Sequence, residues 1–245
     1  MTQSQARALE ISNVIIAFLP TLAVAKASNK RLYLLCLSHC SFVVPSDMAH
    51  EFQCRDVGEN RYEGDAQFVI DAFDAALPHL ASMGSGDQWG TQLFSKKTSF
   101  TSDIQDWIEK AGYATGSTKV FIAEVLVNEK PIAGGRSGPE QARGRVDAAG
   151  NEFIQAGAVV VHDRWIAPYV TSYYGESPLH PDLAASVENR DFMWMEILIT
   201  DFRAGLYRKG AGAALISQVK EYARRIGRRY LWVHCWAGND GKLAR

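Results

Sequence analysis

A glycine-containing turn is the feature of this sequence best suited to bind a ligand. Residues 206–213 read LYRKGAGA and lie between an apolar segment typical of a strand and the start of an amphipathic helix. The first amides of a helix lack intrahelical partners, and the helix dipole favours an anion beside them. Gly210 and Gly212 have no Cβ atom that would keep a phosphate from the backbone, and Arg208 and Lys209 add positive charge. The turn therefore predicts an anion site, and tight packing of helix on strand is the alternative.

Cysteines and histidines offer a second kind of chemistry. The four cysteines are Cys36, Cys40, Cys54 and Cys235, and His39 lies between the first two. No second ligand pair follows at the spacing of a zinc site, so no metal is expected. We expect free, mostly buried thiols in a reducing compartment.

The segments around the turn are expected to form strands and helices in a regular order. Alternating or continuous apolar residues predict strands, and apolar residues at helical spacing predict helices. The expected strands are 52–57, 119–127, 155–162, 192–200 and 229–236, and the expected helices are 65–77, 103–110 and 211–226. A strand, the glycine turn, a helix and a second strand therefore follow one another from residue 192 to residue 236.

Three polar segments between these elements are expected to be loops. Pro78 ends or kinks the first helix, and residues 83–90 form a glycine-rich loop with an exposed Trp89. Residues 169–181 form an aromatic and proline-rich loop. Residues 128–151 are long for a hairpin connection and predict a mobile surface insertion. The arginines of this insertion, expected on a solvated face, are Arg136, Arg143 and Arg145.

The composition is that of an ordinary globular protein. Of the 245 residues, 47% are hydrophobic and 11% aromatic, which can fill a core and excludes disorder as the dominant state. The 26 basic and 27 acidic residues give a net charge of −1, which removes any strong case for nucleic-acid or anionic-membrane binding. The patterning changes near residues 49–52, so we expect an N-terminal extension at 1–50 and one domain at 51–245.

The N-terminal extension contains an apolar run with several interpretations. Residues 14–25 (VIIAFLPTLAVA) are too few to cross a bilayer, which needs about 20 residues, so no membrane span is expected. The run resembles a signal-peptide core with a cleavage site at Ala23–Ala25, but Arg7 and Glu10 cancel where a positive start is usual. We therefore expect a cytoplasmic protein. Secretion, a packed N-terminal helix and a poorly ordered extension are the alternatives.

Residues 209–215 (KGAGAAL) resemble the Q/R-x-x-G-x-G/A motif of the GNAT-type, acetyl-CoA-dependent N-acetyltransferases. In that family the motif lies between the fourth strand and the third helix. The order of elements from residue 52 onward is also similar, and residues 236–243 (WAGNDGKL) are similar to the segment where the family's fifth strand leaves the sheet. The resemblance implies an α+β fold with a central, mostly antiparallel, twisted sheet flanked by helices and truncated at its C-terminus.

The resemblance also implies an activity and a cosubstrate. Such enzymes move the acetyl group of acetyl-CoA to an amine of a small molecule or a protein, by direct attack in a ternary complex. Acetyl-CoA lies between the fourth and fifth strands, where fixed N–H dipoles stabilise the oxyanion of thioester aminolysis. The residues that the resemblance assigns to the cofactor are Ile197, Leu198 and Ile199 for pantetheine, Arg208, Lys209, Gly210, Ala211, Gly212 and Ala213 for the pyrophosphate, and Asn239 for the cofactor arm.

Glu196 is the general base that the resemblance implies, because the family commonly uses a carboxylate on this strand. Within an apolar strand its carboxyl pKa is expected to rise, which suits a base at neutral pH. A structural carboxylate that faces a helix is the alternative, and Asp201 and His234 are the next candidates. The acceptor site is implied to lie at the loop 84–90. Aromatic side chains implied there are Trp89, Tyr173 and Tyr174.

Three departures from the family pattern leave alternatives open. Tyr207 stands at the Q/R position, with Arg208 one place late. The sequence ends at Arg245, before the helix whose tyrosine protonates the thiolate and before two further strands, so the general acid has no candidate. Residues 1–50 could fill the space of those strands, or the gene product is truncated. The alternatives to an active enzyme are a CoA-binding, catalytically impaired relative acting as a binding or regulatory module, and a secreted interaction protein.

Overall fold

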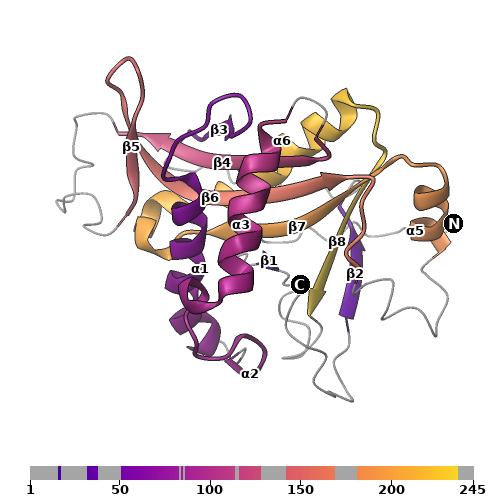
Figure 1. Ribbon diagram of the computed structural model, residues 1–245, viewed down its shortest axis with the longest axis horizontal. Coiled ribbons are helices and arrows are strands. Elements are labelled where there is room, and N and C mark those ends of the chain that lie inside the picture. The colour runs from indigo at the N-terminus through magenta and orange to yellow at the C-terminus, as the bar shows by residue number, and fades with distance from the viewer. Residues whose placement is uncertain are drawn as a thin grey trace, which may run out of the picture.

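The computed structural model describes residues 16–17, 32–37, 51–82, 84, 86–113, 116–127, 142–168 and 181–236. Eight strands in these segments form one sheet in the order β2-β8-β7-β6-β4-β3, while β1 pairs with β7 and β5 pairs with β6 (Figure 1). The strands are β1 (Ile16–Ala17), β2 (Leu32–Cys36), β3 (Gln53–Asp56), β4 (Thr118–Leu126), β5 (Gly144–Val146), β6 (Glu152–Asp163), β7 (Phe192–Thr200) and β8 (Tyr230–Trp236).

All of these strand pairs but one are antiparallel. The exception is the parallel pair of β7 and β8, in which Phe192–Met195 lies opposite Tyr230–Val233. Every residue of β7 is buried, which agrees with its unbroken apolar sequence. The expectation of a mixed α+β fold with a mostly antiparallel sheet flanked by helices is confirmed.

Helices cover both faces of the sheet. α1 (Asp65–Ser82) and α3 (Thr98–Ala111) lie on one face, and α6 (Ala211–Arg225) lies on the other (Figure 1). Side chains alternate between the faces along a strand, so Ile197 packs toward α1 and α3 while Leu198 packs toward α6. The other described helices are α2 (Gly86–Trp89), α5 (Pro181–Glu188) and the 3₁₀ segments η1 (Phe94–Lys96) and η2 (Phe202–Arg208).

The N-terminal part of the chain contributes two strands to this same sheet. β2 pairs antiparallel with β8, from Leu32 opposite Trp236 to Cys36 opposite Trp232. β1 pairs with β7. Two strands that precede residue 50 thus belong to the same sheet as the strands that follow it.

Several connections differ from the expectations drawn from the sequence. α1 continues through Pro78 to Ser82, so the proline does not end the helix. Trp89 is buried rather than exposed, with its ring centroid 6.2 Å from that of Phe94. Arg145 lies in a β5–β6 hairpin and pairs with Glu124 instead of facing solvent. The loop residues 128–141 and 169–180, with Arg136, lie outside the described residues.

Candidate functional site

The parallel pairing of β7 and β8 ends partway along both strands. The last paired residues are Met195 and Val233. Beyond them β7 continues to Thr200 beside β6, whereas β8 continues to Trp236 beside β2. The two central strands therefore take different partners from this point onward.

A β-bulge in β7 lies at the same point. Met195 pairs with Val161 and Ile197 pairs with Val160, so Glu196 is an extra residue without a partner on β6. A bulge bends its strand and turns the extra side chain. Glu196 shares the α1/α3 face with Ile197, where it is close enough to Asp103 of α3 for that carboxylate to raise its pKa.

The Glu196 carboxyl group is fully buried. Its Oε2 accepts a hydrogen bond from the Trp194 indole Nε1 at 2.8 Å, and its Oε1 has no hydrogen-bond partner among the described residues. Burial raises the Glu196 pKa to about 8; the Trp194 hydrogen bond opposes this and the Asp103 charge adds to it. A carboxyl group with this pKa can hold a proton at neutral pH and release it slightly above neutrality.

A second buried polar side chain lies on the same face of the sheet. His162 on β6 is directly opposite Trp194 on β7, and its ring lies 5.6 Å from that of Trp107 and 4.6 Å from that of Trp165. Its Nδ1 contacts the Thr118 hydroxyl at 3.1 Å, while its Nε2 has no hydrogen-bond partner among the described residues. Burial lowers the His162 pKa to about 4, so the imidazole is neutral at neutral pH. The sequence-based prediction missed this residue, and its only signal was a single polar side chain in an apolar strand.

The glycine turn forms the start of α6 as predicted. Gly210 is the N-cap residue and has a φ of +91°, a left-handed conformation that favours glycine. The Ala214 amide donates to the Gly210 carbonyl at 3.0 Å, whereas the amides of Ala211, Gly212 and Ala213 come before this first bond and have no partner within the helix. These three residues are buried. The turn therefore gathers helix-start amides in a water-poor place.

Tight packing, the alternative interpretation of the glycines, is also present. A Cβ atom on Gly157 of β6 would lie 2.8 Å from the Ile199 carbonyl oxygen and 3.5 Å from the Ala211 Cβ atom. The start of α6 thus packs closely against β6 at Gly157, which has no side chain. Close packing and an anion site are compatible, since packing fixes the direction of the helix amides.

The cationic side chains of the turn differ in their surroundings. The Arg208 guanidinium lies 4.0 Å from the centroid of the Phe202 ring, and the centroid of the His79 ring of α1 lies 4.4 Å from that of Phe202. Burial lowers the Arg208 pKa. Lys209 is exposed. A negatively charged ligand at the turn therefore has one partly buried and one solvated cation beside it.

The structure describes the side chain of only one of the remaining predicted site residues, Asp201. Asp201 caps η2 by accepting from the Arg203 amide and pairs with the Arg203 guanidinium at 2.8 Å, which gives it a structural role. The side chain of His234 is outside the described residues, as are Asn239, Tyr173 and Tyr174.

The backbone predicted to hold pantetheine is occupied by the chain itself. β1 pairs with β7 so that Ala17 lies opposite Ile197 and Ile16 lies opposite Leu198. The other edge of β7 is taken by β6, where Ile197, Leu198 and Ile199 pair with Val160, Val159 and Ala158. β1 therefore lies on the edge of β7 that faces β8.

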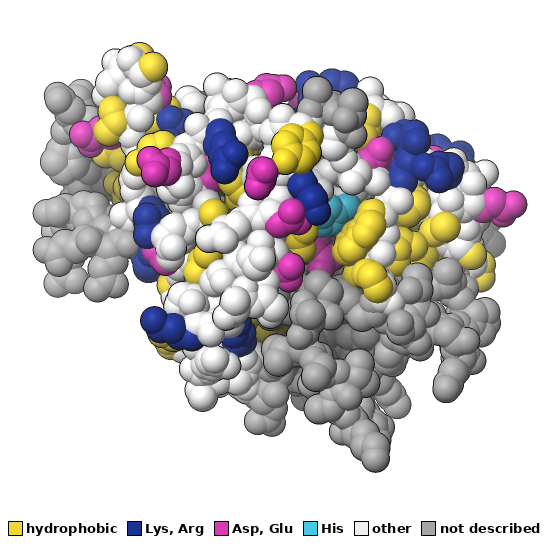
Figure 2. Space-filling model, in the orientation of Figure 1, with side chains coloured by type: hydrophobic (Ala, Val, Ile, Leu, Met, Phe, Trp, Pro, Cys, Tyr) yellow, Lys and Arg dark blue, Asp and Glu magenta, His cyan; other side chains and the backbone are white. Residues whose placement is uncertain are grey.

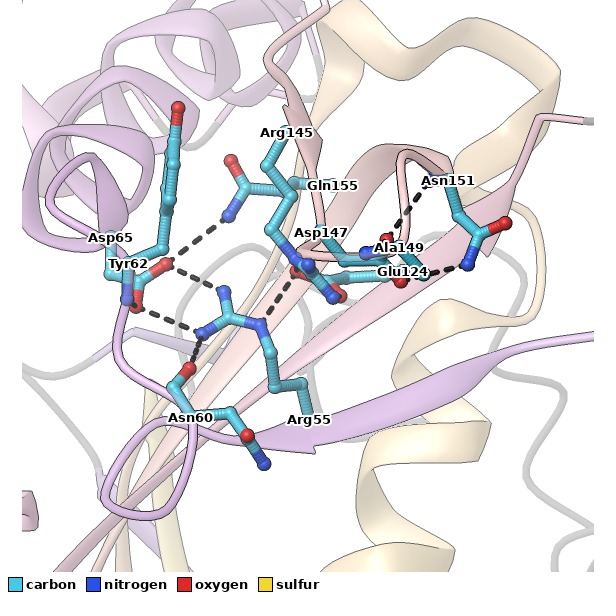
Figure 3. A network of polar contacts seen from close by, with 10 residues as sticks. All are labelled: Arg55, Asn60, Tyr62, Asp65, Glu124, Arg145, Asp147, Ala149, Asn151 and Gln155. Atoms are coloured by element: carbon cyan, nitrogen blue, oxygen red, sulfur yellow. Dashed lines mark hydrogen bonds and ion pairs between the residues drawn. The ribbon is translucent and has the colours of Figure 1, made fainter.

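A polar network at the opposite end of the sheet lines a pocket of about 520 Å³ (Figure 3). Arg55 of β3 pairs with Asp65 at 2.6 Å and with Glu124 at 2.9 Å. Glu124 also pairs with Arg145, which joins β5 to β4. Because these charges already neutralise one another, we assign the network a structural role.

Within the described residues, no group of three His, Cys, Asp or Glu side chains is placed to hold a metal ion, and no helix there is long and apolar enough to span a membrane. Figure 2 shows Lys and Arg side chains interspersed with Asp and Glu over the face of α1 and α3. Comparison of the chain with protein-family models, with curated proteins and with solved structures finds no match.

Proposed function

We propose that this protein is an acetyl-CoA-dependent N-acetyltransferase of the GNAT type, acting on an amine of a small molecule or a protein. The observation that carries the proposal is the end of the β7–β8 pairing at a bulge that contains a buried carboxyl group, in the strand that leads into the glycine turn. A thioester held there has backbone dipoles on one side and a base of raised pKa on the other.

Each part of the cosubstrate has a proposed partner. The pyrophosphate is bound by the amides of residues 208–213, and pantetheine pairs with the backbone of residues 197–199 in the manner of a strand. Glu196 accepts a proton from the ammonium group and the amine nitrogen attacks the thioester carbon. As the C–S bond breaks, CoA leaves with the C–S electron pair and takes the second proton that nitrogen loses, so it is released as the thiol. Asn239 stays a predicted contact of the cofactor arm.

The anion site is tested by adding one negative charge to it. Ala213→Asp places a carboxylate at the third position of α6. The helix dipole stabilises this negative charge, but the charge repels a bound diphosphate. We expect acetyl-CoA affinity, measured by calorimetry, to fall on the order of 100-fold. Ser217→Asp is the matched control, because it adds the same charge at an exposed position one turn further along α6. Equal affinities of the two folded variants would refute the phosphate assignment.

A second candidate function is a CoA-binding module without catalysis. In either function the cosubstrate has to displace β1 from β7, since both use the same edge. Release of free thiol from acetyl-CoA over a panel of amines separates the two functions: turnover supports the enzyme, and binding without turnover supports the module.

Proline substitutions test whether β1 competes with acetyl-CoA. Alternate residues of an antiparallel pair bond to the partner strand, so only one of Ile16 and Ala17 can donate its N–H group to β7. Of Ile16→Pro and Ala17→Pro, one removes that donor and the other is its control. We expect one variant to bind acetyl-CoA about tenfold more tightly, the equivalent of one hydrogen bond. Unchanged affinity in both variants would show that β1 does not compete.

A further inference from the structure

Two buried polar atoms that have no hydrogen-bond partner within the described part of the chain lie on neighbouring strands, on the side of α3. They are Oε1 of Glu196 on β7 and Nε2 of His162 on β6. Glu196 is 0% exposed and His162 is 5% exposed, and a buried polar atom without a partner costs free energy. Such a cost is expected where a ligand supplies the missing hydrogen bond.

The strand register places the two residues on neighbouring strands, two positions apart. His162 lies directly opposite Trp194, and the Trp194 indole donates to the other oxygen of Glu196. Side chains that are opposite or diagonal on adjacent strands lie within about 5–8 Å of one another. Charged groups of α3 act on both, since Asp103 affects Glu196 while Asp106 and Lys110 affect His162.

We infer that His162 Nε2 and Glu196 Oε1 together bind the nitrogen of a primary amine, with His162 as the hydrogen-bond acceptor that orients the nucleophile. This inference rests on the proposed function and names its acceptor class. It requires the imidazole tautomer in which Nδ1–H donates to the Thr118 hydroxyl, which leaves the Nε2 lone pair free to accept.

The proton and electron balance favours a primary over a secondary amine. An alkylammonium gives one proton to the Glu196 carboxylate and becomes a neutral amine with two N–H groups and one lone pair. One N–H donates to His162, and the lone pair forms the C–N bond with the thioester carbon. The C–S electron pair leaves with sulfur, which takes the other proton that nitrogen loses. A secondary amine has only the N–H that must be lost, so the bond to His162 breaks during the reaction.

The surroundings indicate what carries the amine. The His162 ring contacts the rings of both Trp107 and Trp165, which offer apolar surfaces to an aromatic or aliphatic body. Asp103 of α3, whose charge reaches Glu196, favours a cation on its approach, while Asp106 and Lys110 pair with each other on the same helix. The site therefore fits a primary alkylamine with an apolar body, for which 2-phenylethylamine is a suitable probe.

The test compares 2-phenylethylamine with its N-methyl derivative in the full-length protein. We expect His162→Leu to raise the KM for 2-phenylethylamine about tenfold without changing acetyl-CoA affinity, and His162→Gln, whose amide oxygen can accept, to stay within about threefold of the wild type. The N-methyl derivative should react at least about tenfold more slowly with the wild type, and this preference should disappear in His162→Leu.

A readout without turnover separates this inference from the proposed function. In protein with ¹⁵N-labelled histidine, 2-phenylethylamine alone should shift the Nε2 resonance of His162 as that nitrogen accepts a hydrogen bond. Absence of the shift, or equal KM values for His162→Leu and wild type, overturns the inference even if acetyl-CoA binds. Absence of acetyl-CoA binding together with a normal amine-induced shift overturns the proposed function and leaves the amine site standing.

Discussion

Glu196→Gln is expected to lower kcat for amine acetylation by a factor of about 10²–10⁴ and to leave acetyl-CoA affinity unchanged. Glutamine keeps the shape of the side chain and can still accept from the Trp194 indole, but it cannot take a proton from the ammonium group. Steady-state kinetics and calorimetry measure the two effects separately. A kcat within threefold of the wild type would assign Glu196 a purely structural role.

The pH dependence of the wild type gives an independent check. Burial raises the Glu196 pKa to about 8, and the proposed base would act in its ionised form, so kcat/KM is expected to rise with pH and level off above that value. Glu196→Gln should lose this rise. A wild-type profile that is flat from pH 6.5 to pH 9 would exclude a base with this pKa.

The same group affects stability with a defined sign. Because its pKa is higher in the folded state than the ordinary 4.5, the folded protein keeps a proton that the unfolded chain releases. The free energy of unfolding should therefore fall as pH rises toward about 8. His162 works in the opposite direction below 6.5, because its pKa of about 4 is lower than its ordinary value. The interval from 6.5 to 8 thus isolates Glu196, and urea unfolding of wild type and Glu196→Gln should diverge there.

Local patterns in the sequence predicted the elements that hold the site. The apolar run 192–200 coincides with β7, because a strand covered on both faces needs no alternation. The amphipathic segment 211–226 ends within one residue of α6. Both predictions depend on interactions within a few residues, which a single sequence contains.

Features that depend on distant residues could not be predicted in this way. The bulge at Glu196 is defined by its register against β6, which lies more than thirty residues earlier in the chain. The residue types of an apolar strand do not indicate where such a bulge occurs. β1 has two residues, too few for any periodicity, and it reaches a partner about 180 residues away. The sequence predicted a solvent-exposed Arg145 because its partner Glu124 lies about twenty residues earlier, on another strand. The loop tryptophan Trp89 looked exposed because glycines surround it, yet it packs near Phe94.

Arg55→Met should destabilise the protein more than any other single change in the polar network, by about 3–5 kcal/mol. The Arg55 side chain is 6% exposed and serves two carboxylates that are 0% exposed, Asp65 at the start of α1 and Glu124 on β4 (Figure 3). Methionine fills a similar volume but leaves Asp65 as a buried charge without its cation. Because Asp65 begins the helix that covers the face of Glu196 and His162, this loss should also loosen the candidate acceptor site.

Lys110→Met is the matched control for this prediction. It removes a cation from an ion pair of similar length, 2.6 Å to Asp106, but both side chains are about half exposed and lie one turn apart on α3. Water replaces the lost partner there, so the expected cost is about 0.5 kcal/mol or less. Urea unfolding at pH 7 measures both variants. If Arg55→Met cost no more than Lys110→Met, the network would not anchor α1, and the geometry of the acceptor face would have to depend on the apolar core alone.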